Sequence, residues 1–251
     1  MGRDARDAAA GDAGSLSEGL EAKVRGRFVR RYKRFFADVE TDGGLLTVHC
    51  ANPGSMKGFL RPGAAVRCST SDDPRRKLRH TLEMMRIGRT WVGLHTGRAN
   101  ALVARALAAG VPRTLAGYGE VRREVGVEHG GRRSRLDFRL SGHPRRPDAW
   151  LEVKRVTRAE DGLARFPDRV TERGRRHVEL LGRLRRDGSR AVLLFLVQRA
   201  DCDAVAPADD IDPAYGEALR RAAKAGVEVL ALGARVTSRA ITVERELPVV
   251  L

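Results

Sequence analysis

Trp150-Leu151-Glu152-Val153-Lys154-Arg155-Val156 is the stretch that decides the fold. It is a short apolar run that carries a carboxylate and an ammonium two residues apart. A second apolar run, 134–140, contains Asp137, fifteen residues before Glu152. The two runs are predicted to be adjacent strands, 134–140 and 149–156, joined by the Gly/Pro-rich loop 142–147. Such a hairpin can bring both carboxylates and the ammonium together at one end of a sheet.

Asp137, Glu152 and Lys154 together predict a catalytic metal site. Two carboxylates can hold Mg²⁺ or Mn²⁺ through oxygen, with the Val153 carbonyl as a further ligand. The ion can lower the pKa of a bound water and offset charge that develops on a phosphate. Lys154 points to the same strand face as Glu152 and can orient the water or stabilise the phosphate. This is the pattern of the PD-(D/E)xK nuclease core.

A second interpretation of these residues stays open. Glu-x-Lys is a weak pattern, since Glu21-Ala22-Lys23 fits it as well, and a strand with alternating charges is usually a solvated edge. The apolar setting favours the site, because a carboxylate among Leu, Trp and Val needs a partner or a metal.

Composition indicates a polyanion as partner. The 251 residues include 42% hydrophobic side chains, and the formal net charge is +16, with a pI near 11.0. A positive surface attracts nucleic acid first, although genomic base composition also produces an excess of arginine. The three cysteines lack CxxC spacing, which favours buried thiols in a reducing compartment and argues against zinc. We find no apolar run of membrane-spanning length and no signal-peptide core, so we expect a cytoplasmic protein without a membrane partner.

The chain divides into three parts. Residues 1–20 are poor in apolar side chains and are predicted to be a disordered tail. Residues 21–96 are predicted to be a small all-β OB-like barrel, with the hairpin turn Asp42-Gly43-Gly44. Residues 97–251 are predicted to be a mixed α/β domain that resembles PD-(D/E)xK nucleases. The strands expected in the barrel are 35–40, 45–50, 64–69, 82–86 and 90–95. Those expected in the second domain are 120–128, 134–140, 149–156, 191–198 and 227–232, with helices 100–109, 171–187 and 213–225.

The chain resembles the sugar fermentation stimulation protein A family. The segments that carry the resemblance are His49-Cys50-Ala51-Asn52-Pro53-Gly54-Ser55-Met56, Ser134-Arg135-Leu136-Asp137-Phe138, Glu152-Val153-Lys154-Arg155-Val156-Thr157, Phe166-Pro167-Asp168-Arg169-Val170-Thr171-Glu172-Arg173-Gly174, His177, Asp212-Pro213 and Gly226-Val227-Glu228-Val229. The family is described as an OB-like domain before a PD-(D/E)xK-like domain, as binding DNA without sequence preference, and as a candidate regulator of sugar, particularly maltose, metabolism. Pro53, Leu136 and Arg169 depart from its usual residues, and none of the three removes a candidate ligand.

The resemblance implies further site residues. Glu124 fits the family pattern as a third carboxylate ligand. Thr171, Arg173 and His177 lie where a helix next to the metal strand supplies phosphate contacts in PD-(D/E)xK enzymes, and Arg135 and Arg169 join them. From the residues alone, Thr171 can cap this helix, and Arg173 and His177 are one turn apart, which a solvated helix face also explains.

The stretch 23–36 carries seven cations and four aromatics. Arg30, Arg31 and Arg34 are expected to contact phosphate, which needs only charge and reach. Phe28, Phe35 and Phe36 could stack on bases, but filling the barrel core is the favoured interpretation.

Two hypotheses for function result. In the first, the protein binds DNA non-specifically through phosphate contacts and its nuclease-like site is unused. In the second, it is a Mg²⁺- or Mn²⁺-dependent phosphodiesterase acting on nucleic acid. We see no helix-turn-helix pattern, which argues against recognition of a specific operator. A sugar-binding protein has little support, because the sequence lacks an aromatic-rich sugar platform.

Overall fold

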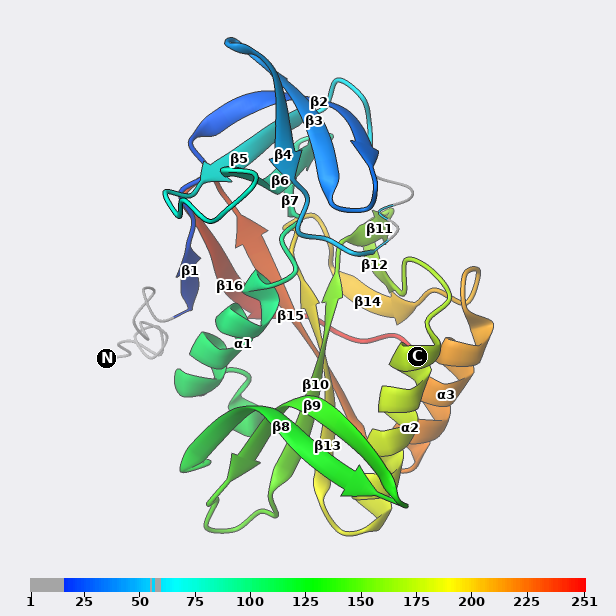
Figure 1. Cartoon of the computed structure of the whole chain (residues 1–251). Helices are drawn as coiled ribbons and strands as arrows, with labels where there is room; N and C mark the ends of the chain where they lie inside the picture. Colours follow the sequence, from blue (N-terminus) through cyan, green and yellow to red (C-terminus); the bar gives the residue numbers. More distant parts are fainter. Residues whose placement is uncertain (1–15, 55, 57–59) are drawn as a thin grey trace, which may run out of the picture.

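The computed structural model describes residues 16–54, 56 and 60–251. They form a barrel, at the top of Figure 1, and a larger α/β body below it. None of the helices in these described residues is long and apolar enough to cross a membrane.

The barrel confirms the predicted OB architecture. Its sheet has the order β4-β3-β2-β5-β6-β7, and β4 also pairs in parallel with β6 through His49 and Thr81. This pairing closes five strands into a barrel whose other ladders are antiparallel, as OB-folds do. The strands are β2 (Val24–Tyr32), β3 (Phe36–Thr41), β4 (Gly44–His49), β5 (Ala65–Thr70), β6 (His80–Ile87) and β7 (Thr90–Gly93). The basic-aromatic stretch 23–36, for which no strand was predicted before residue 35, contains β2.

The larger body is a seven-stranded mixed sheet of order β1-β16-β15-β13-β10-β9-β8, as the α/β prediction requires. β10, β13 and β15 are parallel, and the other ladders are antiparallel. The strands are β1 (Ser17–Gly19), β8 (Glu120–His129), β9 (Arg132–Ser141), β10 (Ala149–Val156), β13 (Arg190–Val197), β15 (Glu228–Val236) and β16 (Ala240–Glu246). A small sheet of β11 (Arg158–Glu160), β12 (Leu163–Phe166) and β14 (Ala204–Pro207) flanks it.

Helices cover both faces of the large sheet (Figure 1). α1 (Arg98–Ala108) packs on one face, followed by the short 3-10 helix η1 (Arg113–Leu115). α2 (Glu172–Arg186) and α3 (Pro213–Lys224) pack on the other. β13 is buried on both faces, as its continuous apolar run predicted: Val192 and Leu194 pack on the α1 side, Leu193 and Phe195 on the α2 side.

Side-chain caps fix where α2 and α3 begin. Thr171 accepts a hydrogen bond from the Gly174 amide at 3.0 Å, as predicted for the start of α2. Asp212 accepts from the Tyr215 amide at 3.0 Å and also from the Thr171 amide at 2.8 Å. One buried carboxylate therefore holds the N-termini of both helices together.

The predicted tail needs a correction. Ser17–Gly19 is an edge strand that pairs with β16, and Leu20 is buried. Composition does not reveal this strand, because backbone hydrogen bonds to β16 hold it and it needs few apolar side chains; Leu20 packs into the core beside it. Residues 1–15 of the predicted tail lie outside the described residues.

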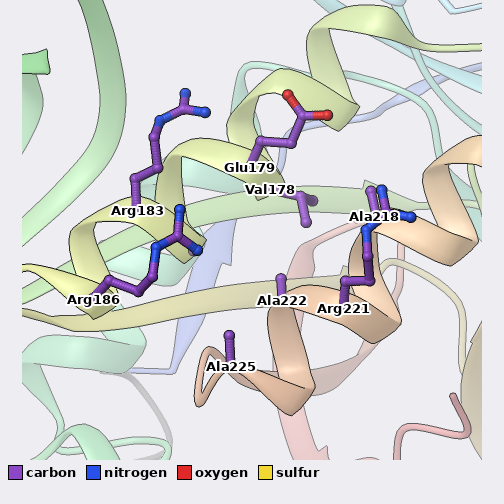
Figure 2. A pocket seen from close by; sticks show the side chains of 9 residues that line it. Val178, Glu179, Arg183, Arg186, Ala218, Arg221, Ala222 and Ala225 are labelled. Carbon is purple, nitrogen blue, oxygen red and sulfur yellow. The ribbon is translucent and has the colours of Figure 1, made fainter. Parts of the chain in front are cut away.

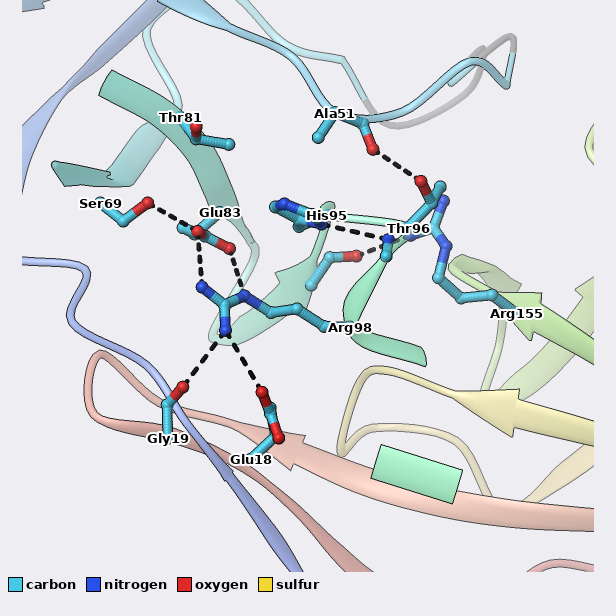
Figure 3. Close-up of polar contacts among 12 residues, drawn as sticks. Glu18, Gly19, Ala51, Ser69, Thr81, Glu83, His95, Thr96, Arg98 and Arg155 are labelled. Atoms are coloured by element: carbon cyan, nitrogen blue, oxygen red, sulfur yellow. Dashed lines mark hydrogen bonds and ion pairs between the residues drawn. The ribbon is translucent and has the colours of Figure 1, made fainter. Parts of the chain in front are cut away.

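Polar contacts join the barrel to the α/β body. Glu83 of β6 is buried and accepts from Arg98 of α1 at 2.8 and 2.9 Å and from Ser69 at 2.7 Å (Figure 3). Arg98 also donates to the Gly19 carbonyl at 3.2 Å and lies 3.8 Å from Glu18. These contacts connect β6 of the barrel to α1 and β1 of the larger body, and so they fix the orientation of the barrel relative to that body.

Candidate metal and nucleic-acid site

The structure brings the predicted triad together where β9 and β10 separate. The ladder between the two strands runs from Leu140 and Ala149 to Phe138 and Leu151. One residue further, the Val153 amide donates to Asp137 Oδ2 at 2.7 Å, so a carboxylate takes the place of a backbone acceptor. The backbone ladder ends at this point, and Asp137 lies close enough to Glu152 for the two charges to interact.

Glu152 is 4% exposed and is bonded on one oxygen only. Its Oε1 accepts from Lys154 Nζ at 2.6 Å and also contacts His177 Nδ1 of α2. Its Oε2 is buried without a hydrogen-bond partner in the described chain. A buried carboxylate oxygen normally has a partner, so this atom is available to a ligand.

The two carboxylates differ in proton affinity. Burial and the neighbouring Glu152 charge raise the pKa of Asp137. Burial also pushes the pKa of Glu152 upward, but the hydrogen bond from His177 and the charge of Lys154 outweigh it, and the net pKa is lowered. A cation between the two groups would relieve the repulsion that raises the pKa of Asp137.

The donor set fits a hard divalent cation. Asp137 and Glu152 offer oxygen and no thiolate, which suits Mg²⁺, Mn²⁺ or Ca²⁺. Within residues 16–54, 56 and 60–251, no group of three or more His, Cys, Asp or Glu side chains has the geometry of a metal site. Such a cation would complete its coordination with backbone oxygens and water, as Mg²⁺ commonly does.

Two residues of this site, Asn100 and Tyr215, were missed from the sequence. Asn100 of α1 donates to Asp137 Oδ1 at 2.8 Å. Tyr215 of α3 is fully buried, its hydroxyl has no partner in the described chain, and burial with the charges of Glu152 and Asp212 raises its pKa. Only the position of Asn100 near the start of a predicted helix gave any sequence signal.

Glu124 does not join Asp137 and Glu152. The β8–β9 register passes from Arg123/Phe138 to Val125/Leu136, and Glu124 itself has a φ of 52°. This irregularity turns the Glu124 side chain outward, where it lies 3.3 Å from Arg135, half-exposed. Two candidate residues, a metal ligand and a phosphate contact, therefore bind each other.

The α2 residues divide between the site and solvent. His177 is buried against Glu152, whereas Arg173 is exposed, so the two do not share one phosphate-facing surface. Thr171 caps the helix through its hydroxyl. Spacing alone put Arg173 and His177 on one face, but Arg173 lies in the first turn of α2 and is exposed, whereas His177 lies one turn further along and contacts Glu152.

A basic cleft lies between the barrel and the α/β body. It has a volume of about 230 Å³. Four arginines and one carboxylate line it together with polar residues of both bodies: Arg155, Arg158, Arg165, Arg169, Asp168, Asn52, Thr96, Thr157 and Thr171. Arg155 donates to the Gly93 carbonyl at 3.0 Å, and burial lowers its pKa to about 10, so it stays charged at neutral pH. Val156 also lines the cleft and lies about 13 Å along β10 from Glu152, at the usual strand rise.

The three barrel arginines predicted to contact phosphate differ in the groups that they bind within the chain. Arg30 pairs with Asp38 at 2.8 Å, and Arg31 donates to the carbonyls of Arg34 and Asn52. The exposed Arg34 side chain has no acidic partner in the part of the chain that the structure describes. Arg34 is thus the cation of this group that is most available to phosphate.

The aromatics of the same stretch correct the core prediction. Phe28 is 3% exposed and fills the barrel core, as predicted. Phe35 is 43% exposed, and Phe36 is only half-buried. The core interpretation is therefore wrong for Phe35.

A second basic hollow lies between α2 and α3, with a volume of about 230 Å³. Figure 2 shows Arg183 and Arg186 on α2 and Arg221 on α3 around Ala222 and Ala225. Glu179 also lines the hollow and Arg221 pairs with Glu217, so the positive charge on this side of the body is partly compensated.

Comparisons with known proteins agree along most of the chain. The family model described as "SfsA N-terminal OB domain" matches residues 29–94, and the one described as "Sugar fermentation stimulation protein RE domain" matches residues 97–240. A sugar fermentation stimulation protein homolog from Maricaulis maris is 47% identical over 230 residues, which cover 91% of this chain and 96% of that protein. Another from Halorhodospira halophila is 51% identical over 227 residues, covering 89% and 93%. The solved structure of Pyrococcus furiosus SfsA in complex with Ca²⁺ superposes with a TM-score of 0.81 at 27% identity, covering 91% of this chain and 96% of that one.

Proposed function

The chain belongs to the sugar fermentation stimulation protein family, and from this premise we propose that it binds DNA without sequence preference and holds one divalent cation between Asp137 and Glu152. The observation that carries the metal proposal is the buried, unpartnered Oε2 of Glu152 beside a second carboxylate. The Pyrococcus furiosus relative, solved in complex with Ca²⁺, supports a hard cation. A regulatory role in sugar, particularly maltose, metabolism is proposed from the family resemblance alone.

The topology around the site supports a nuclease-like α/β body. The chain runs α1, η1, β8, β9, β10, β11, β12, α2, β13. Within the large sheet the aspartate lies on the second of the three meandering strands β8, β9 and β10, and Glu-x-Lys lies on the third. This order supports the proposal of a PD-(D/E)xK-like core, to which the sequence pattern pointed. The resemblance is therefore one of strand order as well as of residues.

Exposed cations support the DNA proposal. The net charge is +16, and Arg34, Arg169 and Arg173 are exposed without acidic partners among the described residues. Contacts of this kind position the backbone and carry no sequence information. Binding should weaken steeply with salt, because each neutralised phosphate releases a counterion.

Cleavage of phosphodiesters is a second candidate function, and Lys154 favours it. A bound cation would supply Lewis acidity toward a phosphate. Lys154 Nζ, held by Glu152 Oε1, would place a positive charge beside the same phosphate. His177 holds the other side of that oxygen and keeps Glu152 ionised.

Metal binding is tested by calorimetry and thermal unfolding with Mn²⁺ or Mg²⁺. At ten times the Kd, the cation should stabilise the fold by about 1.4 kcal/mol, a Tm rise of roughly 3–6 °C. Asp137→Asn should abolish the rise, and Glu124→Gln, a matched carboxylate change outside the site, should keep it. Absence of Mn²⁺ binding to the wild-type protein at millimolar metal would refute the site.

DNA binding and cleavage are tested separately. Unrelated duplexes should compete about equally for the protein, with or without EDTA, and a strong preference for one sequence would contradict the proposal. If the site cleaves, Lys154→Ala should retain the metal-dependent Tm rise and lose cleavage. Metal binding without any cleavage leaves the pure binding function.

A further inference from the structure

The turn between β2 and β3 has an unusual backbone. Lys33 and Arg34 have φ angles of 46° and 63°, in the left-handed region that usually takes Asn or Gly. Arg31 holds the turn by donating to the Arg34 carbonyl from Nε at 3.0 Å and from Nη2 at 2.7 Å. Strained turns of this kind persist where the surroundings fix them, and they concentrate at functional sites. Here the turn presents Phe35 to solvent.

Phe35 forms one wall of an apolar hollow of about 300 Å³. Its described lining consists of Phe35, Phe36, His49, Arg76, Lys77 and Leu78. The Phe35 and His49 rings lie 6.3 Å apart at an interplanar angle of 27°, and Tyr32 stacks behind Phe36 at 5.6 Å and 20°. Burial and the Arg76 cation lower the pKa of His49, so its ring is uncharged at neutral pH. The hollow is therefore walled by aromatic faces.

Cations surround these faces. The Arg34 guanidinium lies 5.8 Å from the centre of the Phe35 ring, and Arg76 and Lys77 also line the hollow. None of the described lining residues is acidic. An aromatic floor with a cationic rim complements a flat base attached to a phosphate. A duplex cannot use such a floor, because its base faces are stacked on each other.

One side chain links the turn that carries Phe35 to the basic cleft. Arg31, which holds the β2–β3 turn, donates from Nη2 to the Asn52 carbonyl at 2.7 Å, and Asn52 lines the basic cleft.

We propose that the hollow of Phe35, Phe36 and His49 binds an unpaired nucleobase, so that the chain prefers single-stranded to duplex nucleic acid. The proposal rests on the DNA binding proposed above. Stacking supplies the preference, while the arginines supply the affinity that both forms share.

The test compares fluorescence anisotropy of a labelled oligothymidine, the same oligomer with abasic sites, and a duplex of equal length. Wild-type protein should bind the oligothymidine more tightly than the abasic strand. Phe35→Leu keeps the apolar bulk and removes the ring face, and it should weaken single-strand binding by roughly 5- to 50-fold with duplex affinity and salt slope unchanged. Phe35→Trp should restore binding, and Leu45→Ala, which removes another exposed apolar side chain of the barrel, should change nothing.

Three outcomes overturn the proposal. They are equal wild-type affinity for the base-containing and abasic strands, an unchanged single-strand affinity in Phe35→Leu, or an equal loss for strand and duplex. If wild-type protein still binds duplex in these cases, DNA binding survives and only the stacking site fails. If it binds no nucleic acid, both fail.

Discussion

Replacing Arg98 by methionine should destabilise the protein strongly, because it leaves a buried carboxylate without its cation. Glu83 is 2% exposed and accepts two of its three hydrogen bonds from Arg98, at 2.8 and 2.9 Å. Only the Ser69 hydroxyl would remain, at 2.7 Å. Breaking a buried ion pair from one side costs about 3–5 kcal/mol. For a chain of this size, that lowers Tm by roughly 6–20 °C.

The assay is urea unfolding followed by circular dichroism, with differential scanning fluorimetry for Tm. The matched control is Arg105→Met on the same helix. The half-exposed Arg105 side chain pairs with Glu18 at 2.9 Å, and its loss should lower the free energy of unfolding by less than about 1 kcal/mol. The double change Arg98→Met with Glu83→Leu removes both buried charges and should recover most of the loss. The reasoning fails if Arg98→Met and Arg105→Met destabilise equally, or if the double variant is no more stable than Arg98→Met.

Other substitutions and labelling experiments test the site and the core. Asp212→Ala should destabilise by about 2 kcal/mol or more in urea unfolding, since it uncaps α3 and frees the Thr171 amide, whereas Thr171→Ala should cost about 1 kcal/mol. His177→Ala removes a hydrogen bond that lowers the pKa of Glu152 in the folded protein. The variant should therefore be less stable than wild type by the largest amount at neutral pH. The difference should shrink as the pH falls from about 4.3, the usual pKa of a glutamate, through the lowered pKa of folded Glu152, as measured by unfolding at a series of acidic pH values. All three cysteines are buried, and burial raises their thiol pKa values, so Ellman's reagent near pH 8 should label none in native protein and all three in denaturant.

Local patterns in the sequence were enough to place the central triad. Asp137, Glu152 and Lys154 lie in two strands that are neighbours in sequence, so their pairing needs only a hairpin. Thr171 caps α2 because a cap acts within one helical turn. The barrel followed from the regular spacing of short strands, which favours a closed sheet.

The predictions were wrong where contacts between distant residues, or an irregular backbone, determine the structure. β1 pairs with a strand 225 residues away, through Ser17 and Thr242, which no local pattern reveals. Glu124 was placed in the site because it fits the family pattern, and nothing in the sequence reveals its positive φ. Phe35 was assigned to the core because aromatic residues in strands usually fill cores, whereas a strained turn presents it to solvent.

The path of the chain makes the barrel an insertion within the larger body. The backbone leaves the α/β sheet after β1 and returns to it at α1, and Arg98 bonding to the Gly19 carbonyl at 3.2 Å shows that these two stems are adjacent. Cutting the chain at 94–97 would not release the barrel, since its other stem still runs into β1. A graft that joins Leu20 to Gly97 through a short linker could delete the barrel and keep the seven-stranded sheet. During synthesis, the barrel can fold before β16 is made, whereas β1 cannot pair until β16 is present. The large sheet is therefore completed after the barrel has folded.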